Sequence, residues 1–298
     1  MSDNPQQRRN GELKVSDDVW LAVSTTEWAL GDLEVHRSED GTGAQIVIRK
    51  GDSIERLPIP QGPPPAKLIS FNYMEIFYTN DTVIAFLRHF VSDVGVTLQM
   101  EIRPGAHRSW DIFVQQIWPL LSSNINAIDL IVDTIRELRS RVSPTVLCDC
   151  ANLRSICASL LPLEWPADDR REASDGQALT KWIHTPREDG LPKTFLHYGP
   201  MLSDTVVTGF RKTFLNASTA ANYIIVVTGE EAPADYVPFE EKNEQTWERL
   251  AFRRQDEHVW LMERGPILRD EKQWTEWKKE AVEGIHQKNV IVVFVDEI

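Results

Sequence analysis

The chain has 298 residues, of which 42% are hydrophobic and 26% are charged, and it carries a formal net charge of −13. This length suits one large domain or two moderate ones. The acidic balance argues against nucleic acid or an anionic membrane as partner, because a basic surface supplies most of the attraction in both cases, and no apolar run reaches the roughly 18 residues that span a bilayer.

The N-terminal segment predicts no secretory route. Residues 1–14 are polar, include Arg8 and Arg9, and are followed by no apolar core of a signal peptide. The chain has only three cysteines, a sparse and odd set that suits a reducing compartment. We therefore expect a cytoplasmic or nuclear protein in which residues 1–15 form a disordered tail.

Residues 16–61 predict a small antiparallel meander after a short start. Apolar and polar residues alternate from Leu33 and again from Ile46, with a turn-rich segment between them, and residues 54–59 supply a third strand. The Gly-Pro-Pro-Pro sequence at 62–65 is a stiff linker and marks a boundary.

Strand-like and helix-like runs alternate over residues 66–229. This alternation indicates parallel strands joined by crossover helices. The irregular spacing of the strands is near the upper range of leucine-rich repeats, about 20–29 residues, although no strict repeat consensus is present. The pattern alone allows either a doubly wound sheet or a curved solenoid. The expected strands are Met74–Tyr78, Val96–Ile102, Ala127–Val132, Arg154–Leu160, Thr194–Tyr198 and Tyr223–Val227, and the expected helices are Asp81–Phe90, Ser109–Leu121, Ile135–Arg141, Gly176–His184 and Val206–Phe214.

Residues 230–298 predict a C-terminal cap made of a hairpin, a helix and a last strand. Two apolar runs, Leu250–Phe252 and Val259–Met262, flank a charged loop. Asp270 and Glu271 follow a Gly-Pro break and place negative charge at a helix N-terminus, where it is favourable. The last strand is expected at Asn289–Val295.

One face of the expected C-terminal helix is apolar. Trp274, Trp277, Ala281 and Ile285 fall at i, i+3, i+7 and i+11, which places them on the same side of a helix. Burial of an indole is worth a few kcal/mol, so we interpret these residues as core, with a binding surface as the alternative.

No group of residues has the spacing of a catalytic or metal site. Cys148, Cys150 and Cys157 offer three thiols, whereas a structural zinc site needs four ligands, usually paired as CxxC. The acid pairs at 168–169 and 230–231 could act in acid–base chemistry but stand in polar loops, where solvated charge is the simpler interpretation. We expect no catalytic, cofactor or metal residues.

Two stretches are candidates for recognition. The run Arg136–Arg141 is locally basic in an acidic chain, although a solvated helix end is the simpler explanation. Residues 165–176 form a long polar loop, and a long loop on a regular scaffold is a natural binding element, with a tolerated insertion as the alternative.

An ordered set of charged, aromatic and proline positions fills residues 238–281. It matches the pattern PFE-x-KN-x-x-TxERL-x-x-RR, then WL-x-x-R-x-PI-x-R-[DE]E-x-x-W-x-x-W-x-x-EA. On these positions the chain resembles an F-box-associated protein family expanded in nematodes. The matching residues are Pro238, Phe239, Glu240, Lys242, Asn243, Thr246, Glu248, Arg249, Leu250, Arg253, Arg254, Trp260, Leu261, Arg264, Pro266, Ile267, Arg269, Asp270, Glu271, Trp274, Trp277, Glu280 and Ala281.

This resemblance implies the substrate-recognition part of a cullin-type ubiquitin ligase. In the family, an acidic pair opens an F-box helical segment, whereas here Trp28 follows Asp17 and Asp18 almost at once. Most of the F-box is therefore expected to be missing, and binding to the ligase adaptor subunit is expected to be weak or absent.

The resemblance also favours the solenoid over the doubly wound sheet. We expect an irregular leucine-rich-repeat-like βα solenoid over residues 66–229, with the N-terminal β-meander before it and the C-terminal hairpin-helix cap after it. The expected function is a nonenzymatic protein–protein interaction module with an unknown protein target. An enzyme on a doubly wound sheet is the rival, and a pseudo-adaptor that binds its partner and delivers it nowhere is a third alternative.

Overall fold

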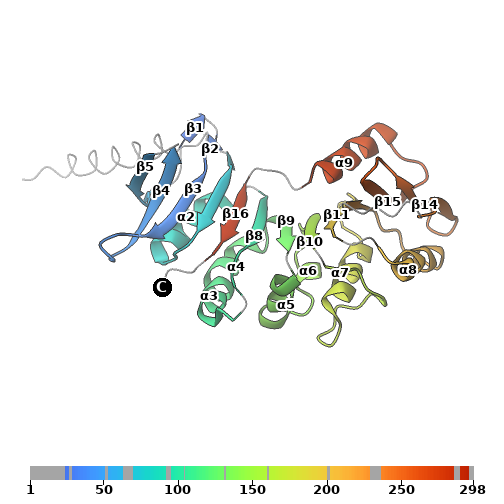
Figure 1. Cartoon of the computed structure of the whole chain (residues 1–298), viewed down its shortest axis with the longest axis horizontal. Coiled ribbons are helices and arrows are strands. Elements are labelled where there is room, and N and C mark those ends of the chain that lie inside the picture. The colour runs from blue at the N-terminus through green and yellow to red at the C-terminus, as the bar shows by residue number, and fades with distance from the viewer. Residues whose placement is uncertain are drawn as a thin grey trace, which may run out of the picture. The chain divides into compact units, whose positions relative to one another are not determined.

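The computed structural model describes residues 24–26, 29–50, 53–62, 70–91, 95–103, 105–130, 132–159, 161–199, 202–228, 236–284 and 289–294. These residues form a mixed α/β structure that divides into two compact units (Figure 1): Met1–Ile125 with Gln287–Ile298, and Asn126–His286. The expected tail and the F-box-like start at 16–23 lie outside the described residues. Among the helices of the described part, none has the length and apolar character to cross a membrane.

The strands of the first unit follow the order β8-β16-β7-β3-β4-β5. The expected meander is confirmed, because β3, β4 and β5 pair antiparallel in succession. A smaller sheet has the order β1-β2-β6. The bounds are β1 Ser24–Thr26, β2 Ala29–Leu30, β3 Leu33–Arg37, β4 Ala44–Lys50, β5 Ser53–Pro58, β6 Ser70–Phe71, β7 Tyr73–Ile76, β8 Val96–Met100 and β16 Val290–Val293.

The last strand, β16, lies far from its neighbours in sequence. It pairs parallel with β7 on one side and β8 on the other, and all four of its residues are buried. Asn289, with a φ of 55°, fixes its start. The Asn289 backbone N–H donates to the Phe71 carbonyl oxygen at 2.7 Å, and its side-chain oxygen accepts from the Phe71 N–H at 3.0 Å. The strand expected at 289–295 therefore forms within the first unit.

Among the described residues of the first unit, the helices are α2 (Asp81–Val91) and a continuous run from His107 to Leu121. The Asn80 side chain accepts from the Val83 N–H at 3.0 Å and so caps the start of α2. The run comprises α3 (His107–Ile112), a π-helical turn η1 (Phe113–Ile117) and α4 (Trp118–Leu121). Pro119 lacks a backbone donor, which accounts for the wider turn directly before it.

The strands of the second unit follow the order β13-β14-β15-β12-β11-β10-β9. The strands β9 to β12 are parallel and lie in chain order. The remaining three pair antiparallel, so the hairpin expected from the two apolar runs is confirmed as β14 and β15. The bounds are β9 Ile125–Leu130, β10 Ser155–Ser159, β11 Lys193–Tyr198, β12 Tyr223–Thr228, β13 Phe239–Asn243, β14 Glu248–Arg254 and β15 Val259–Pro266; the helices are α5 Val132–Arg141, α6 Val146–Asp149, α7 Asp175–His184, α8 Asp204–Leu215 and α9 Glu271–Glu283.

Helices cover both faces of the sheet at β11 and β12. Tyr223 of β12 contacts Phe210 of α8 on one face, and the alternate residues Ile224 and Val226 pack with Trp274 of α9 on the other. Figure 1 shows α7 and α8 across the strands from α9. The open sheet face that an ideal binding solenoid presents is therefore occupied here by α9.

The apolar face of α9 is core, as its spacing predicts. Asp270 caps the helix, since its side chain accepts from the Lys272 and Gln273 N–H groups at 2.9 and 3.1 Å. Trp274 is 3% exposed, Trp277 is half-buried and meets it edge-on, and Ile285 lies outside the described residues. The Trp274 ring lies so close to Gly265 that a Cβ at that position would collide with it.

Candidate recognition site

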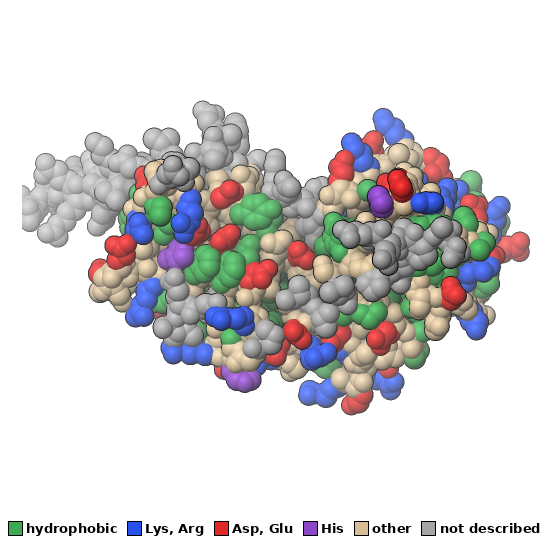
Figure 2. All heavy atoms as spheres, in the orientation of Figure 1, with side chains coloured by type: hydrophobic (Ala, Val, Ile, Leu, Met, Phe, Trp, Pro, Cys, Tyr) green, Lys and Arg blue, Asp and Glu red, His purple; other side chains and the backbone are tan. Residues whose placement is uncertain are grey.

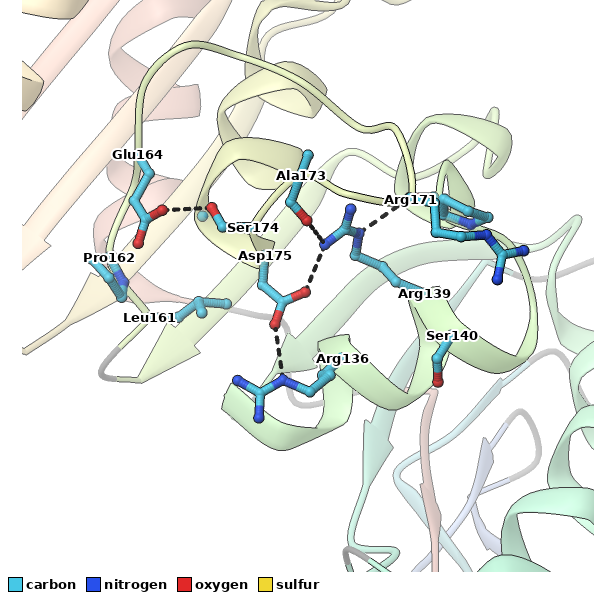
Figure 3. A pocket seen from close by; sticks show the side chains of 12 residues that line it. Arg136, Arg139, Ser140, Leu161, Pro162, Glu164, Arg171, Ala173, Ser174 and Asp175 are labelled. Atoms are coloured by element: carbon cyan, nitrogen blue, oxygen red, sulfur yellow. Dashed lines mark hydrogen bonds and ion pairs between the residues drawn. The ribbon is translucent and has the colours of Figure 1, made fainter.

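A pocket of about 420 Å³ lies between α5 and the segment that leads from β10 to α7 (Figure 3). Helix α5 contributes Arg136, Arg139 and Ser140 to its lining. The segment, residues 161–174, is called the pocket loop below. The structure thus brings together the two stretches that the sequence singled out for recognition, the basic run and the long polar loop.

Arg139 ties the pocket loop to α5. Its side chain is 8% exposed, and its Nη1 donates to the Ala173 carbonyl oxygen at 2.9 Å and to the Asp175 carboxylate at 2.8 Å. Its Nη2 donates to the Arg170 carbonyl oxygen at 2.9 Å, and its Nε donates to that of Pro144 at 3.2 Å. Figure 3 shows the guanidinium reaching across to the loop. The planar fork of donors matches this set of acceptors, so Arg139 is structural.

The start of α7 fixes the end of the pocket loop. Ser174 and Gln177 form a capping box, in which each side chain bonds the other residue's backbone N–H. The Ser174 hydroxyl also donates to the Glu164 carboxylate. A Cβ at Gly176 would collide with the Pro162 carbonyl oxygen, so only glycine permits this close approach of loop and helix.

An aromatic cluster holds the middle of the loop. The Trp165 ring centroid lies 4.7 Å from that of Phe210 and 5.4 Å from that of His184. The His184 Nδ1 lies 2.8 Å from the Thr180 carbonyl oxygen, which can only accept, so this nitrogen carries the proton. Burial lowers the pKa of His184 to about 4, which keeps the ring neutral near pH 7. The loop is therefore anchored at three places.

Two arginines at the pocket make no hydrogen bond within the described part of the chain, although Arg136 takes part in two long ion pairs. Arg136 is 67% exposed, and its nearest carboxylates, Asp175 and Asp133, lie 3.6 and 3.8 Å away, beyond hydrogen-bonding distance. Arg171 is exposed, and no partner for it occurs in the described part of the chain. The charged residues of the lining are these two arginines, Arg139, Glu164 and Asp175.

Asp168, from the first acid pair weighed in the sequence, is a poor candidate for a general base. Asp168 is held by the Arg170 guanidinium, with an Oδ2–Nη2 distance of 2.6 Å. That side-chain hydrogen bond lowers the pKa of Asp168 to about 2, so the carboxylate is a poor proton acceptor near neutral pH. The pair at 230–231 lies outside the described residues.

The three cysteines are free and poorly suited to bind metal or act as nucleophiles. Cys150 and Cys157 are buried, and burial raises the pKa of each to about 12. Cys148 is half-buried, with its Sγ 3.8 Å from the Thr185 hydroxyl, and burial raises its pKa as well. Metal ligation and nucleophilic attack need the thiolate. Within the described ranges, no three His, Cys, Asp or Glu residues are grouped to hold a metal ion.

No family model, no curated protein and no solved structure matches this chain. The residues that carry the F-box-associated resemblance nevertheless have definite positions in the second unit. Glu248 and Arg264 form a buried ion pair at 2.6 Å, Asp270 caps α9, and Trp274 fills the core. These positions maintain the fold at the hairpin and α9, apart from the pocket lining.

The sequence could not identify all of the pocket. It singled out the run that contains Arg136 and most of the loop that contains Arg171, but it gave neither residue a role. Leu161, Pro162 and Glu164 precede the stretch that it considered. Their position follows from the path of the loop along α7, where the Glu164 N–H donates to the Gly176 carbonyl oxygen at 3.3 Å.

Proposed function

We propose that this chain is a nonenzymatic protein-binding module that contacts its target at the pocket between α5 and the pocket loop. The observation that carries the proposal is the contrast within this site. The loop is held by Arg139, by the capping box and by Trp165, while Arg136 and Arg171 remain available. A loop that is ordered before binding loses little conformational entropy when a partner docks.

We further propose that residues 66–229 follow the plan of an irregular βα solenoid. The chain order of the parallel strands β9 to β12 supports this proposal, because successive crossovers of the same hand place their helices on one face, and α5, α7 and α8 lie on the same side of these strands (Figure 1). An enzyme on a doubly wound sheet would use a switch in strand order for its ligand cleft. The strands from β9 to β12 contain no such switch.

The link to a ubiquitin ligase is a separate part of the proposal and rests on the resemblance. The segment that would contact the adaptor subunit, residues 16–23, lies outside the described residues. We expect weak binding, with a dissociation constant above about 1 μM, corresponding to less than about 8 kcal/mol. A titration of the purified chain with the purified adaptor subunit measures it, and tighter binding would establish a working F-box.

The target-binding proposal is tested by affinity purification from the native cell with quantitative mass spectrometry. The Arg136→Gln/Arg171→Gln variant removes both available charges and keeps the side-chain length similar. The matched control is Arg88→Gln/Arg108→Gln, which changes two exposed helical arginines of the first unit. We expect a set of proteins that the wild type and the control retain and the pocket variant loses.

If the wild type, the pocket variant and the control variant retain the same set of proteins, the target binds elsewhere. Circular dichroism and the denaturation midpoint of each variant should match those of the wild type, because Arg136 and Arg171 form no hydrogen bond in the described part of the chain. Solvated surface charges typically contribute less than about 1 kcal/mol to stability.

A further inference from the structure

We propose that the pocket receives a carboxylate of the target, so that the preferred ligand is an acidic peptide segment with an Asp or Glu at the contact point. This inference rests on the proposed function and names the chemistry of its partner. It starts from the two arginines that the fold leaves available, Arg136 on α5 and Arg171 on the pocket loop.

The guanidinium of Arg136 is held at the pocket by a long ion pair and makes no hydrogen bond to the described residues. Its Nε lies 3.6 Å from Asp175, whose other oxygen receives Arg139 at 2.8 Å. Asp175 therefore stands between the two guanidinium groups, as Figure 3 shows, and keeps Arg136 at the pocket through a long ion pair. Neither Nη atom of Arg136 donates a hydrogen bond within the described residues, although Nη1 lies 3.8 Å from the Asp133 carboxylate. The outer edge of the guanidinium can therefore donate two parallel hydrogen bonds to a planar carboxylate.

The charge balance of the lining favours a carboxylate over a phosphate. Arg136, Arg139 and Arg171 provide three positive charges, and Glu164 and Asp175 provide two negative charges. Within the lining one net positive charge remains, which a single carboxylate neutralises. Asp133 on α5 lies outside the lining, 3.8 Å from Arg136, and partly offsets that charge. A phosphate monoester carries about −1.5 to −2 near pH 7 and would leave the pocket with excess negative charge.

Apolar groups beside the arginines suit an acidic side chain. Pro144, Pro162 and Ala173 contribute to the same lining and are exposed or half-buried, so part of their apolar surface is open to a ligand. The methylene groups of a Glu or Asp side chain, or a neighbouring apolar residue of the peptide, can cover this surface while the carboxylate meets the guanidinium groups.

The overall charge of the chain opposes the binding of an acidic peptide. With a net charge of −13, the protein as a whole repels an acidic peptide. Figure 2 shows acidic and basic side chains interspersed on the visible face, without one large basic area. A preference for acidic peptides would therefore have to come from a local site such as this pocket.

The test uses an array of immobilised hexapeptides with random neighbours around one fixed central residue. That residue is Asp, Glu, Asn, Gln or phosphoserine, and the array is probed with the purified full chain. We expect Asp and Glu peptides to bind about tenfold or more above their amide counterparts and at least as well as phosphoserine. The preference should fall about tenfold in Arg136→Gln and in Arg171→Gln, and should persist in Arg88→Gln/Arg108→Gln.

Each other outcome has a definite meaning. Equal binding of acid and amide peptides, or preference for phosphoserine, overturns the carboxylate assignment. An acid preference that survives both pocket substitutions places the site elsewhere and also overturns it. If the co-purification depends on the two arginines while the array shows no acid preference, this inference fails and the proposed function stands; loss of both effects rejects the two together.

Discussion

The indole of Trp274 should be a main source of stability for the second unit. It is 3% exposed, its ring meets Trp277 edge-on at 5.6 Å between centroids, and the Arg269 guanidinium lies 4.1 Å above it. Replacement by alanine removes this burial and leaves a cavity against Gly265, which should cost about 3–5 kcal/mol. With a urea m-value of about 2–3 kcal/mol per M, the midpoint should fall by roughly 1–2.5 M.

Urea denaturation followed by circular dichroism measures this change. Trp277→Ala is the matched control on the same helix, because its half-buried ring should contribute less, about 1–2 kcal/mol. The urea midpoint of Trp274→Phe should lie between those of the wild type and Trp274→Ala, since phenylalanine restores part of the apolar volume. An unchanged midpoint for Trp274→Ala, or a larger loss for Trp277→Ala, would refute the assignment of Trp274 to the core.

Three further predictions follow from buried polar groups. Arg264→Met leaves the buried carboxylate of Glu248 without its partner and should lower the free energy of unfolding by about 3–5 kcal/mol. Adding Glu248→Leu should recover most of that loss. Additive losses in urea denaturation would contradict the pairing. Because the pKa of His184 is lowered to about 4, the unfolded chain takes up this proton first as pH falls from about 6.5. The free energy of unfolding should therefore drop by about 2 kcal/mol by pH 5 and by about 3 kcal/mol by pH 4. The drop should be smaller in His184→Gln, and equal urea midpoint changes from pH 7.5 to 5 in both proteins would disprove it. The thiols should react slowly with a maleimide at pH 7 in the native protein, Cys148 before Cys150, and rapidly after unfolding. Fast native labelling of Cys150 would contradict its burial. Stoichiometric zinc that is lost on Cys148→Ser would contradict the expectation that the cysteines bind no metal.

The elements that the sequence predicted well have strong local signals. The run Tyr223–Val227 is continuous and apolar because β12 is covered on both faces, and it was expected within one residue of the observed strand. The meander and the hairpin also carry a clear alternation or turn signal. Strand β13 was missed because its sequence FEEKN is charged, as is usual for a partly exposed strand at the end of the order.

Features that depend on distant parts of the chain could not be predicted in this way. The pairing of β16 with β7 and β8 has no local signal, since a run of four aliphatic residues fits any buried strand position. The helix run at 107–121 was expected, but not its π-turn. Trp247, a large apolar residue close to the hairpin, is 72% exposed at a turn with a φ of 56°.

The pocket illustrates the same limit at the level of function. Its charged residues come from α5, from the pocket loop and from the first residue of α7, and Arg139 joins these elements by hydrogen bonds to two loop carbonyl groups and to Asp175. The sequence pattern indicates a basic run and a polar loop, but it does not indicate that the two lie side by side in the fold. Only the folded chain shows that Arg139 is used for structure while Arg136 remains exposed.

The most direct test of target binding at the pocket is site-specific photo-crosslinking. A photoreactive amino acid in place of Ser140, an exposed residue of the pocket lining, reports whatever lies against the site. The same group in place of Arg108, exposed on α3, is the control. In the native cell, we predict one defined adduct from position 140 and none from position 108. Absence of an adduct at position 140, or the same adduct from both positions, would contradict the account.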